Sequence, residues 1–176
     1  MILEYPEDNE YQIVPFKPEI HLKNFNCDDD LNIYFKENAY ESEQELINKN
    51  YCLIRKSDQF PSVLFCVSNA EIKSHFDLDM VIAGQHYKSY PAIRIGRFAT
   101  HKQLTGHGLG SKTLDFIKLW FTRGNKTGCR FIVVDSRNDG RVLHFYKKND
   151  FVEYPVNNLS NKTLLLYYDL KSFNID

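Results

Sequence analysis

Three glycines, Gly106, Gly108 and Gly110, lie where a polar loop meets the start of a predicted helix. Glycine lets the main chain approach a ligand closely, so that its N–H groups can turn toward that ligand. The N-terminus of a helix adds roughly half a positive charge. Together these features favour a phosphate group, and we predict an anion-binding loop. The alternative is that the glycines only allow a tight turn and close packing of the helix on the preceding strand.

Two nucleotide-binding motifs fit this loop incompletely. Gly106–Thr113 follows the P-loop pattern G-x-x-x-x-G-K-[ST] except at one position, and Asp135 ends an apolar segment as a magnesium-binding carboxylate would. Gly106 and Gly108 also fit the dinucleotide pattern G-x-G-x-x-G. In both patterns Ser111 stands where the motif requires a glycine. A P-loop-like nucleotide-binding protein therefore remains one alternative.

A third pattern covers more of the chain. The segment Gln103–Gly108 reads Gln-Leu-Thr-Gly-His-Gly, which resembles the Q/R-x-x-G-x-G/A signature of the GNAT acetyltransferase superfamily. Further along, Asn138 and the segment His144–Phe151 resemble the N…F-Y-E-K-x-G-F block of that superfamily. Lys147 replaces the usual Glu of this block, and Asp150 replaces the usual Gly before its last Phe.

The resemblance also extends toward the N-terminus. Phe25–Asn32, followed by Ala39, is similar to the F-D-C-G-x-x-x-L-N…A opening of one GNAT subgroup, which includes toxins that acetylate aminoacyl-tRNA. Asp28 replaces the glycine of that opening, and Tyr90–Arg97 is similar to the central strand of the subgroup. The resemblance covers about residues 11–170. It is specific for the superfamily and not for the substrate.

The resemblance implies where acetyl-CoA binds. In this superfamily the cosubstrate lies in the gap where the central strand splays from its neighbour. Main-chain groups of Phe98, Ala99 and Thr100 would hold the pantetheine arm and polarise the thioester carbonyl, while Asn138 and Phe145 would flank the arm from the other side. A nine-residue loop would cradle the diphosphate, namely Gln103, Leu104, Thr105, Gly106, His107, Gly108, Leu109, Gly110 and Ser111.

The resemblance assigns the catalytic acid to Tyr146. Attack of an amine on a thioester builds negative charge on the carbonyl oxygen and then expels a thiolate, which a nearby phenol can protonate. Helical spacing from Val142 alone would instead make Tyr146 a core aromatic. No Ser/His/Asp or Cys/His arrangement supports a nucleophile, so we expect direct transfer. The residues that offer a general base before the central strand are Glu71, His75, Asp77 and Asp79, of which none is preferred.

The expected fold is α/β (α+β). Periodicity is compatible with one alternating unit, and the resemblance implies a GNAT-like mixed, largely antiparallel sheet of about six to seven strands, with helices on both faces and a splayed central strand. We expect a single domain over residues 1–176 and a loop over 69–89. Strands are expected over 11–16, 51–55, 63–68, 92–99, 130–134 and 164–170, and helices after Asp28–Asp30, over 41–48, from the glycine loop to Gly124, and over 141–148.

Composition sets the class of protein. The 176 residues are 43% hydrophobic and 26% charged with a net charge of −1, which excludes a disordered, collagen-like or coiled-coil chain. No apolar run is long enough for a membrane helix, and the acidic N-terminus broken by Pro6 is not a secretory signal. Four scattered cysteines indicate reduced thiols in the cytoplasm, and six histidines lack zinc-binding spacing, so we expect no metal.

Acidic and basic residues are concentrated in different parts of the chain. Residues 1–50 carry twelve acids and four bases, whereas residues 94–148 carry twelve bases and three acids. The basic segment is either an ordinary solvated surface or a site for a polyanion such as a phosphorylated cofactor.

These observations predict a cytoplasmic acyltransferase. We expect an acetyl-CoA-dependent N-acetyltransferase that transfers acetyl, not aminoacyl, groups directly to a primary amine of a small molecule, peptide or protein. Aminoacyl-tRNA is the alternative acceptor, which a pI near 6.6 does not favour because RNA binding requires many phosphate contacts. A non-catalytic acyl-CoA-binding module is a further alternative. No membrane partner is expected, and a homodimer is left open.

Overall fold

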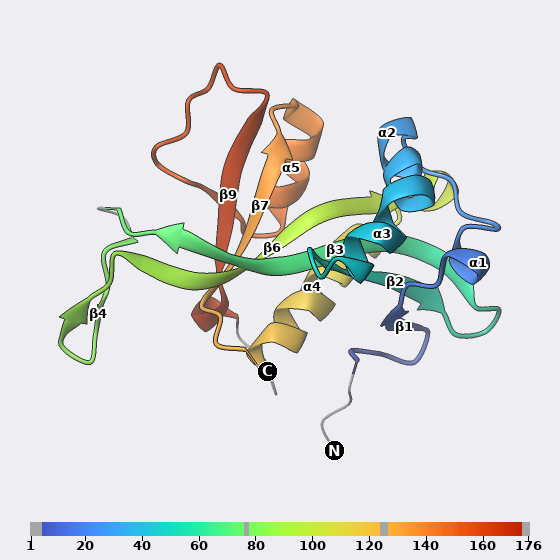
Figure 1. The fold of residues 1–176 in the computed structure, drawn as a ribbon, viewed down its shortest axis with the longest axis horizontal. Helices are drawn as coiled ribbons and strands as arrows, with labels where there is room; N and C mark the ends of the chain where they lie inside the picture. The colour runs from blue at the N-terminus through green and yellow to red at the C-terminus, as the bar shows by residue number, and fades with distance from the viewer. Residues whose placement is uncertain (1–4, 76–77, 124–126, 174–176) are drawn as a thin grey trace. The chain divides into compact units, whose positions relative to one another are not determined.

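The computed structural model describes residues 5–75, 78–123 and 127–173 (Figure 1). It contains a seven-stranded sheet in the order β1-β2-β3-β6-β7-β9-β8 and a separate hairpin of β4 and β5. The pair β6–β7 is parallel, while β1–β2, β2–β3, β7–β9 and β8–β9 are antiparallel. The mixed, largely antiparallel sheet expected from the sequence is thereby confirmed. The strands are β1 (Tyr11–Pro15), β2 (Lys49–Arg55), β3 (Phe60–Lys73), β4 (Val81–Ile82), β5 (Gln85–His86), β6 (Ser89–Thr100), β7 (Phe131–Arg137), β8 (Val152–Glu153) and β9 (Thr163–Asp169).

The helices differ in detail from the expectation. The helix expected after Asp28 begins as α2 and passes into a π-helix, and the helix expected over 41–48 begins earlier and ends at Gln44. The predicted C-terminal residue of the longest helix, Gly124, lies outside the described residues. In the described part of the chain, no helix has the length and hydropathy needed to span a membrane. The helices are α1 (Pro18–His21), α2 (Asp29–Ile33), the π-helix η1 (Tyr34–Asn38), α3 (Ala39–Gln44), the 3-10 helix η3 (Lys102–Leu104), α4 (Leu109–Thr122), α5 (Gly140–Lys148) and the 3-10 helix η4 (Leu170–Ser172).

The chain divides into two compact units. The first comprises Met1–Ser68 and Gly96–Gly124, and the second comprises Asn69–Ile95 and Asn125–Asp176. The boundaries therefore fall inside strands β3 and β6. The expectation of a single domain stays a prediction.

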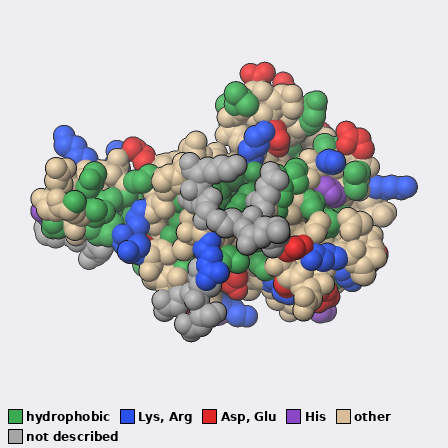
Figure 2. Space-filling model, turned by 90° about the horizontal axis from the view of Figure 1, so that it is seen from below, with side chains coloured by type: hydrophobic (Ala, Val, Ile, Leu, Met, Phe, Trp, Pro, Cys, Tyr) green, Lys and Arg blue, Asp and Glu red, His purple; other side chains and the backbone are tan. Residues whose placement is uncertain are grey.

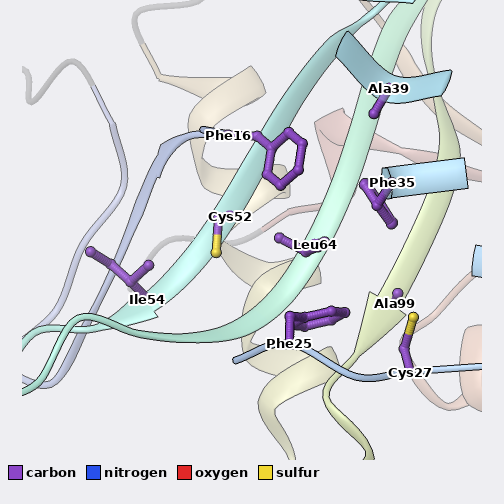
Figure 3. Close-up of a cluster of buried hydrophobic side chains, with 9 residues drawn as sticks. All are labelled: Phe16, Phe25, Cys27, Phe35, Ala39, Cys52, Ile54, Leu64 and Ala99. Carbon is purple, nitrogen blue, oxygen red and sulfur yellow. The ribbon is translucent and has the colours of Figure 1, made fainter. Parts of the chain in front are cut away.

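The first unit has one hydrophobic cluster under its N-terminal helices. Because side chains alternate along a strand, Cys52 and Ile54 of β2 lie on one face, where they join Leu64 of β3. Phe35 of η1 and Ala39 of α3 pack on the same cluster (Figure 3). The apolar face of the expected helix is thus buried against the sheet, as its spacing indicated.

Helix α4 packs on the opposite face of this unit. The ring of Tyr51, one residue before Cys52, lies 4.9 Å from the ring of Trp120 on α4 and 5.6 Å from that of Phe65. Leu114 and Ile117 of α4 are completely buried. Within this unit, helices therefore cover both faces of the strands, as expected.

The second unit shows that the expected loop over 69–89 was partly wrong. Strand β3 continues to Lys73, because Ile72 is buried in a cluster with Tyr90, Ala92, Phe131 and Val133. Beyond it, β4 and β5 form a hairpin whose turn residues both have a positive φ, 52° at Ala83 and 77° at Gly84. The polar composition of this segment concealed the alternation that makes a half-buried strand.

Candidate functional site

Two glycines of the loop, just before α4, have a left-handed main-chain conformation. Gly108 is the N-cap of the helix with φ 80°, and Gly106 has φ 85°. A Cβ atom built at either glycine would meet no other atom within 4 Å. Conformation, and not crowding, therefore makes glycine the favoured residue at these two positions. The same observation shows open space beside the Cβ positions of Gly106 and Gly108.

The first turn of α4 offers main-chain donors. The first helical hydrogen bond runs from the Lys112 N–H to the Gly108 carbonyl at 3.0 Å. The N–H groups of the four preceding residues, Gly108 to Ser111, therefore have no partner within the helix, and no side chain caps it. Leu109 and Gly110 have no polar side-chain atoms, so they can offer only these main-chain groups. Donors converging at a positive helix end suit a diphosphate.

At the beginning of the loop, main-chain N–H groups are hydrogen-bonded to carbonyls of the same segment. Gln103 and Leu104 lie in η3, and the N–H groups of Thr105 and His107 donate to the carbonyls of Lys102 at 3.4 Å and Leu104 at 3.3 Å. The nine residues predicted to cradle a diphosphate therefore divide into a hydrogen-bonded support, Gln103 to His107, and a donor-bearing end, Gly108 to Ser111.

The last residues of β6 extend beyond its pairing with β7. The parallel register ends at the pair Ile95–Val134, and β6 continues to Thr100. Of the three residues predicted to hold the pantetheine arm, Ala99 is buried in the cluster of Figure 3, while Phe98 and Thr100 are half-buried. Their main-chain groups on this edge are not used in the β7 register, so they remain suited to binding an extended ligand.

In the second unit, α5 carries the predicted acid. Asp139 caps this helix, because its Oδ1 accepts the N–H groups of Arg141 at 3.0 Å and Val142 at 3.1 Å. Tyr146 is only 8% exposed, with its ring 5.1 Å from that of Phe145 and 5.4 Å from that of Phe151. A tyrosine phenol is protonated at neutral pH, and burial raises the pKa of Tyr146 still further above its usual value. A general acid needs this protonated form.

The turn after α5 accommodates the aspartate that replaces the usual glycine. Asp150 has φ 65°, in the left-handed region, and its N–H donates to the Lys147 carbonyl at 3.0 Å. The Phe151 N–H donates to the Tyr146 carbonyl at 3.1 Å. This turn closes the helix in the way a glycine would, because aspartate tolerates the left-handed conformation better than most residues.

Asn138 has a structural role that its motif did not predict. Its Nδ2 donates to the carbonyls of Leu159 at 2.8 Å and Asn161 at 3.1 Å, and its N–H donates to Lys162 at 2.9 Å. The side chain thus holds the loop before β9, and its Oδ1 atom is the group left for a ligand. A role beside the pantetheine arm stays a prediction.

Several bases of the segment 94–148 are paired with carboxylates. Figure 2 shows basic and acidic side chains interspersed on one face. For these bases the interpretation as an ordinary solvated surface is favoured, and a polyanion site would have to depend on other groups. The pairs are Lys112–Asp8 at 2.7 Å, Arg94–Asp135 at 2.9 Å, Arg130–Asp169 at 2.6 Å and Lys147–Glu153 at 2.6 Å.

The residues considered as a general base are also placed. Asp79 lies 2.9 Å from the Nδ1 atom of His86, Glu71 accepts the Ser89 hydroxyl at 2.9 Å, and Asp77 lies outside the described residues. None of these contacts favours one residue as the general base.

Across residues 5–75, 78–123 and 127–173, no three metal-ligating side chains come together as a metal site. The sequence did not single out His101, a buried residue directly before the loop.

Comparisons with known proteins identify the fold. No family model matches the sequence, and no curated protein sequence matches it. Among solved structures, a tyrosine-to-phenylalanine mutant of KacT has a TM-score of 0.74 at 18% identity, with 93% of this chain and 97% of that chain covered. AtaT complexed with acetyl-methionyl-tRNAfMet has a TM-score of 0.73 at 18% identity, covering 92% and 96%.

A third structure carries the cosubstrate. A tyrosine-to-phenylalanine mutant of the AtaT toxin, bound to the C-terminus of the antitoxin AtaR and acetyl-CoA, has a TM-score of 0.71 at 17% identity and covers 93% of this chain and 96% of that chain. At such identities the likeness establishes the fold, which is the one that the motifs predicted.

Proposed function

We propose that this protein is an acetyl-CoA-dependent N-acetyltransferase whose acceptor is the amino group of an aminoacyl-tRNA. One observation carries the first half of this proposal: two left-handed glycines lead into an uncapped helix N-terminus. Four main-chain N–H groups at a positive helix end suit the diphosphate of coenzyme A, and a Cβ built at Gly106 or Gly108 would meet open space. Similarity in fold to a structure that contains acetyl-CoA supports the same cosubstrate here.

We also propose roles in binding the pantetheine arm for residues before and after this loop. Main-chain groups of Phe98, Ala99 and Thr100 would bind the pantetheine arm and donate to the thioester carbonyl. Asn138 and Phe145 would flank the arm. A fixed main-chain N–H near the developing oxyanion stabilises the transition state by a few kcal/mol, about 3 in typical cases.

The proposed reaction is a direct transfer. The neutral amine nitrogen attacks the thioester carbonyl carbon, the C–N bond forms and the C–S bond breaks. Tyr146 gives its proton to the leaving sulfur, and the proton released by the amine returns to solvent, from which the phenol is reprotonated. A phenol is protonated at neutral pH, and burial raises the pKa of Tyr146 further, so its hydroxyl still carries the proton when the thiolate forms.

The choice of acceptor depends on the comparisons. The similarity to AtaT complexed with acetyl-methionyl-tRNAfMet supports aminoacyl-tRNA, although the sequence had favoured a smaller amine. A small-molecule, peptide or protein amine is the second candidate, because bases of the segment 94–148 are paired with carboxylates and the net charge is −1. RNA binding needs several unpaired cations facing phosphates.

One experiment separates the two acceptors. Protein is incubated with radiolabelled acetyl-CoA and with aminoacylated tRNA, the same tRNA after deacylation, or a panel of free amines and peptides. The proposal predicts label on aminoacylated tRNA that mild alkali releases as N-acetylamino acid. Label on free amines alone supports the second candidate. Coenzyme binding without transfer to any acceptor supports the non-catalytic module instead.

A further inference from the structure

His101 lies between the last residue of β6 and the glycine loop. It is 5% exposed, and its ring lies 5.5 Å from the ring of Phe25 and 5.0 Å from that of Phe60. A histidine enclosed by aromatic rings is costly unless both of its nitrogen atoms have partners.

Both nitrogen atoms of His101 have partners of opposite kinds. Nε2 lies 3.0 Å from the carbonyl oxygen of Asn24, and Nδ1 accepts the N–H of Gln103 at 3.2 Å. A carbonyl can only accept and an N–H can only donate, so the hydrogen of the neutral ring must be on Nε2. The two contacts together fix the neutral ring in one tautomer and one orientation.

The main chain around His101 joins the loop to two other segments of the first unit. Its N–H donates to the Ser62 carbonyl of β3 at 2.9 Å, and its carbonyl accepts the N–H of Leu104 at 2.9 Å. The neighbouring Lys102 N–H donates to the Asn26 carbonyl at 2.8 Å. The start of the loop is therefore tied to β3 and to the segment before α2, and the imidazole is the side chain that links them.

We propose that His101 is a positioning residue that holds the glycine loop in the conformation that binds the coenzyme. It acts through Gln103: the imidazole caps η3, and η3 sets the path of the chain to Gly106 and Gly108. This inference rests on the proposed function, because it assigns His101 to the coenzyme half of that site.

Two substitutions separate the two hydrogen bonds of the ring. His101→Asn keeps an acceptor for the Gln103 N–H, since asparagine is a good cap, but loses the donor to Asn24. His101→Leu loses both bonds and keeps apolar packing. By calorimetric titration with CoA, we expect affinity to fall about tenfold in His101→Leu and about threefold in His101→Asn. The kcat at saturating acetyl-CoA stays within about twofold of wild type, because no reacting group is changed.

His21 provides a matched control. It is also buried in the first unit, its Nδ1 accepts the Lys17 N–H at 2.9 Å, and its ring stacks on Phe16 at 5.8 Å. His21→Leu should lower thermal stability as His101→Leu does, without weakening CoA binding. If His101→Leu binds CoA as wild type does, or loses no more affinity than His21→Leu, the inference is wrong.

A second measurement tests His101 without the coenzyme. In ¹⁵N-histidine-labelled free protein at neutral pH, NMR should show the His101 ring as the Nε2–H tautomer, and the Gln103 amide should exchange slowly in wild type and rapidly in His101→Leu. An Nδ1–H ring, or equal exchange, would overturn the positioning role. Wild-type protein that binds no CoA would instead refute the proposed function and the coenzyme half of this inference, while the NMR results still decide whether His101 holds the loop.

Discussion

The Nζ atom of Lys112, in the first turn of α4, lies 2.7 Å from Oδ2 of Asp8. Asp8 also accepts the main-chain N–H groups of Tyr11 at 2.7 Å and Glu10 at 2.8 Å. Lys112, in the first turn of the helix, is thus paired with the acidic N-terminal segment. The phosphate binding that we propose for the loop would then depend mainly on main-chain donors.

This pair predicts a stability difference that depends on pH. Burial by itself raises the pKa of Asp8, but the hydrogen bonds from Lys112, Tyr11 and Glu10 outweigh it and lower the pKa below 3.8. The carboxylate therefore stabilises the fold above pH 3.8, and this contribution is lost as the pH falls through the lower folded value. Asp8→Asn should lower the free energy of unfolding at pH 7 by about 1 kcal/mol or less, since the pair is partly exposed.

Urea unfolding of wild type and Asp8→Asn at pH 7 and pH 3 measures this effect. The difference should shrink at the lower pH. Lys112→Met tests the partner in a double-mutant cycle. The double variant should lose less free energy of unfolding than the sum of the losses in the two single variants. A difference that is the same at both pH values would contradict the assigned pKa direction.

Gly108→Ala should weaken both the fold and coenzyme binding. An alanine at φ 80° costs roughly 1–2 kcal/mol even though its Cβ meets no atom within 4 Å. Relief of that strain would turn the amides at the start of α4 away from a shared ligand. Unfolding and CoA titration measure the two effects.

Gly140→Ala is the matched control for Gly108→Ala. Gly140 begins α5, has an ordinary φ and also has open space at its Cβ. Alanine there should leave stability equal or raise it by up to about 1 kcal/mol, with CoA binding unchanged. Normal CoA affinity in folded Gly108→Ala would argue against the loop as the diphosphate site.

Tyr146→Phe should slow turnover by about 100-fold or more, the usual contribution of a general acid, while CoA affinity stays near that of wild type. Because burial raises the pKa of this phenol, the wild-type kcat should show no loss from its ionisation up to pH 10. Steady-state kinetics and a pH profile provide the measurement.

Tyr154→Phe is the control for this change. Its hydroxyl donates to the Lys73 carbonyl at 3.3 Å, so the substitution removes a phenol from the same unit outside the predicted machinery. Turnover should remain near wild type. Equal kcat values for wild type and Tyr146→Phe would remove Tyr146 from the mechanism.

Asp150→Gly should stabilise the protein. The left-handed φ of 65° strains any residue with a Cβ, and glycine relieves this strain by about 0.5–1 kcal/mol. Asp150→Ala should destabilise it, because alanine tolerates this conformation less well than aspartate. Thermal unfolding of the three proteins should give the order Gly, Asp, Ala; an alanine variant as stable as the glycine variant would contradict the role assigned to backbone conformation.

The sequence predicted those parts of the fold that local pattern specifies. Gly106 and Gly108 marked the start of α4, apolar segments located β6 and β7, and helical spacing of apolar residues located α5. The short elements α1 and β8 were not predicted, because their four and two residues are too few to carry a periodicity, and β8 forms by pairing with β9. Strand β3 was predicted too short, since Ile72 is buried by Tyr90 and Phe131, which lie far along the chain.

The candidate site shows the same division. Family motifs predicted Tyr146 and the glycine loop, but not that Asn138 binds carbonyls of Leu159 and Asn161. The role of His101 depends on Asn24, which is 77 residues away, so no local pattern could have indicated it.

The central claim is that main-chain donors at the start of α4 bind a diphosphate. Calorimetric titration of the wild-type protein with CoA and with pantetheine, which lacks the diphosphate, tests it most directly. We predict saturable heat with CoA and an affinity for pantetheine that is at least about 100-fold weaker, a difference of roughly 2.7 kcal/mol. No heat with CoA, or equal affinity for the two ligands, would contradict it.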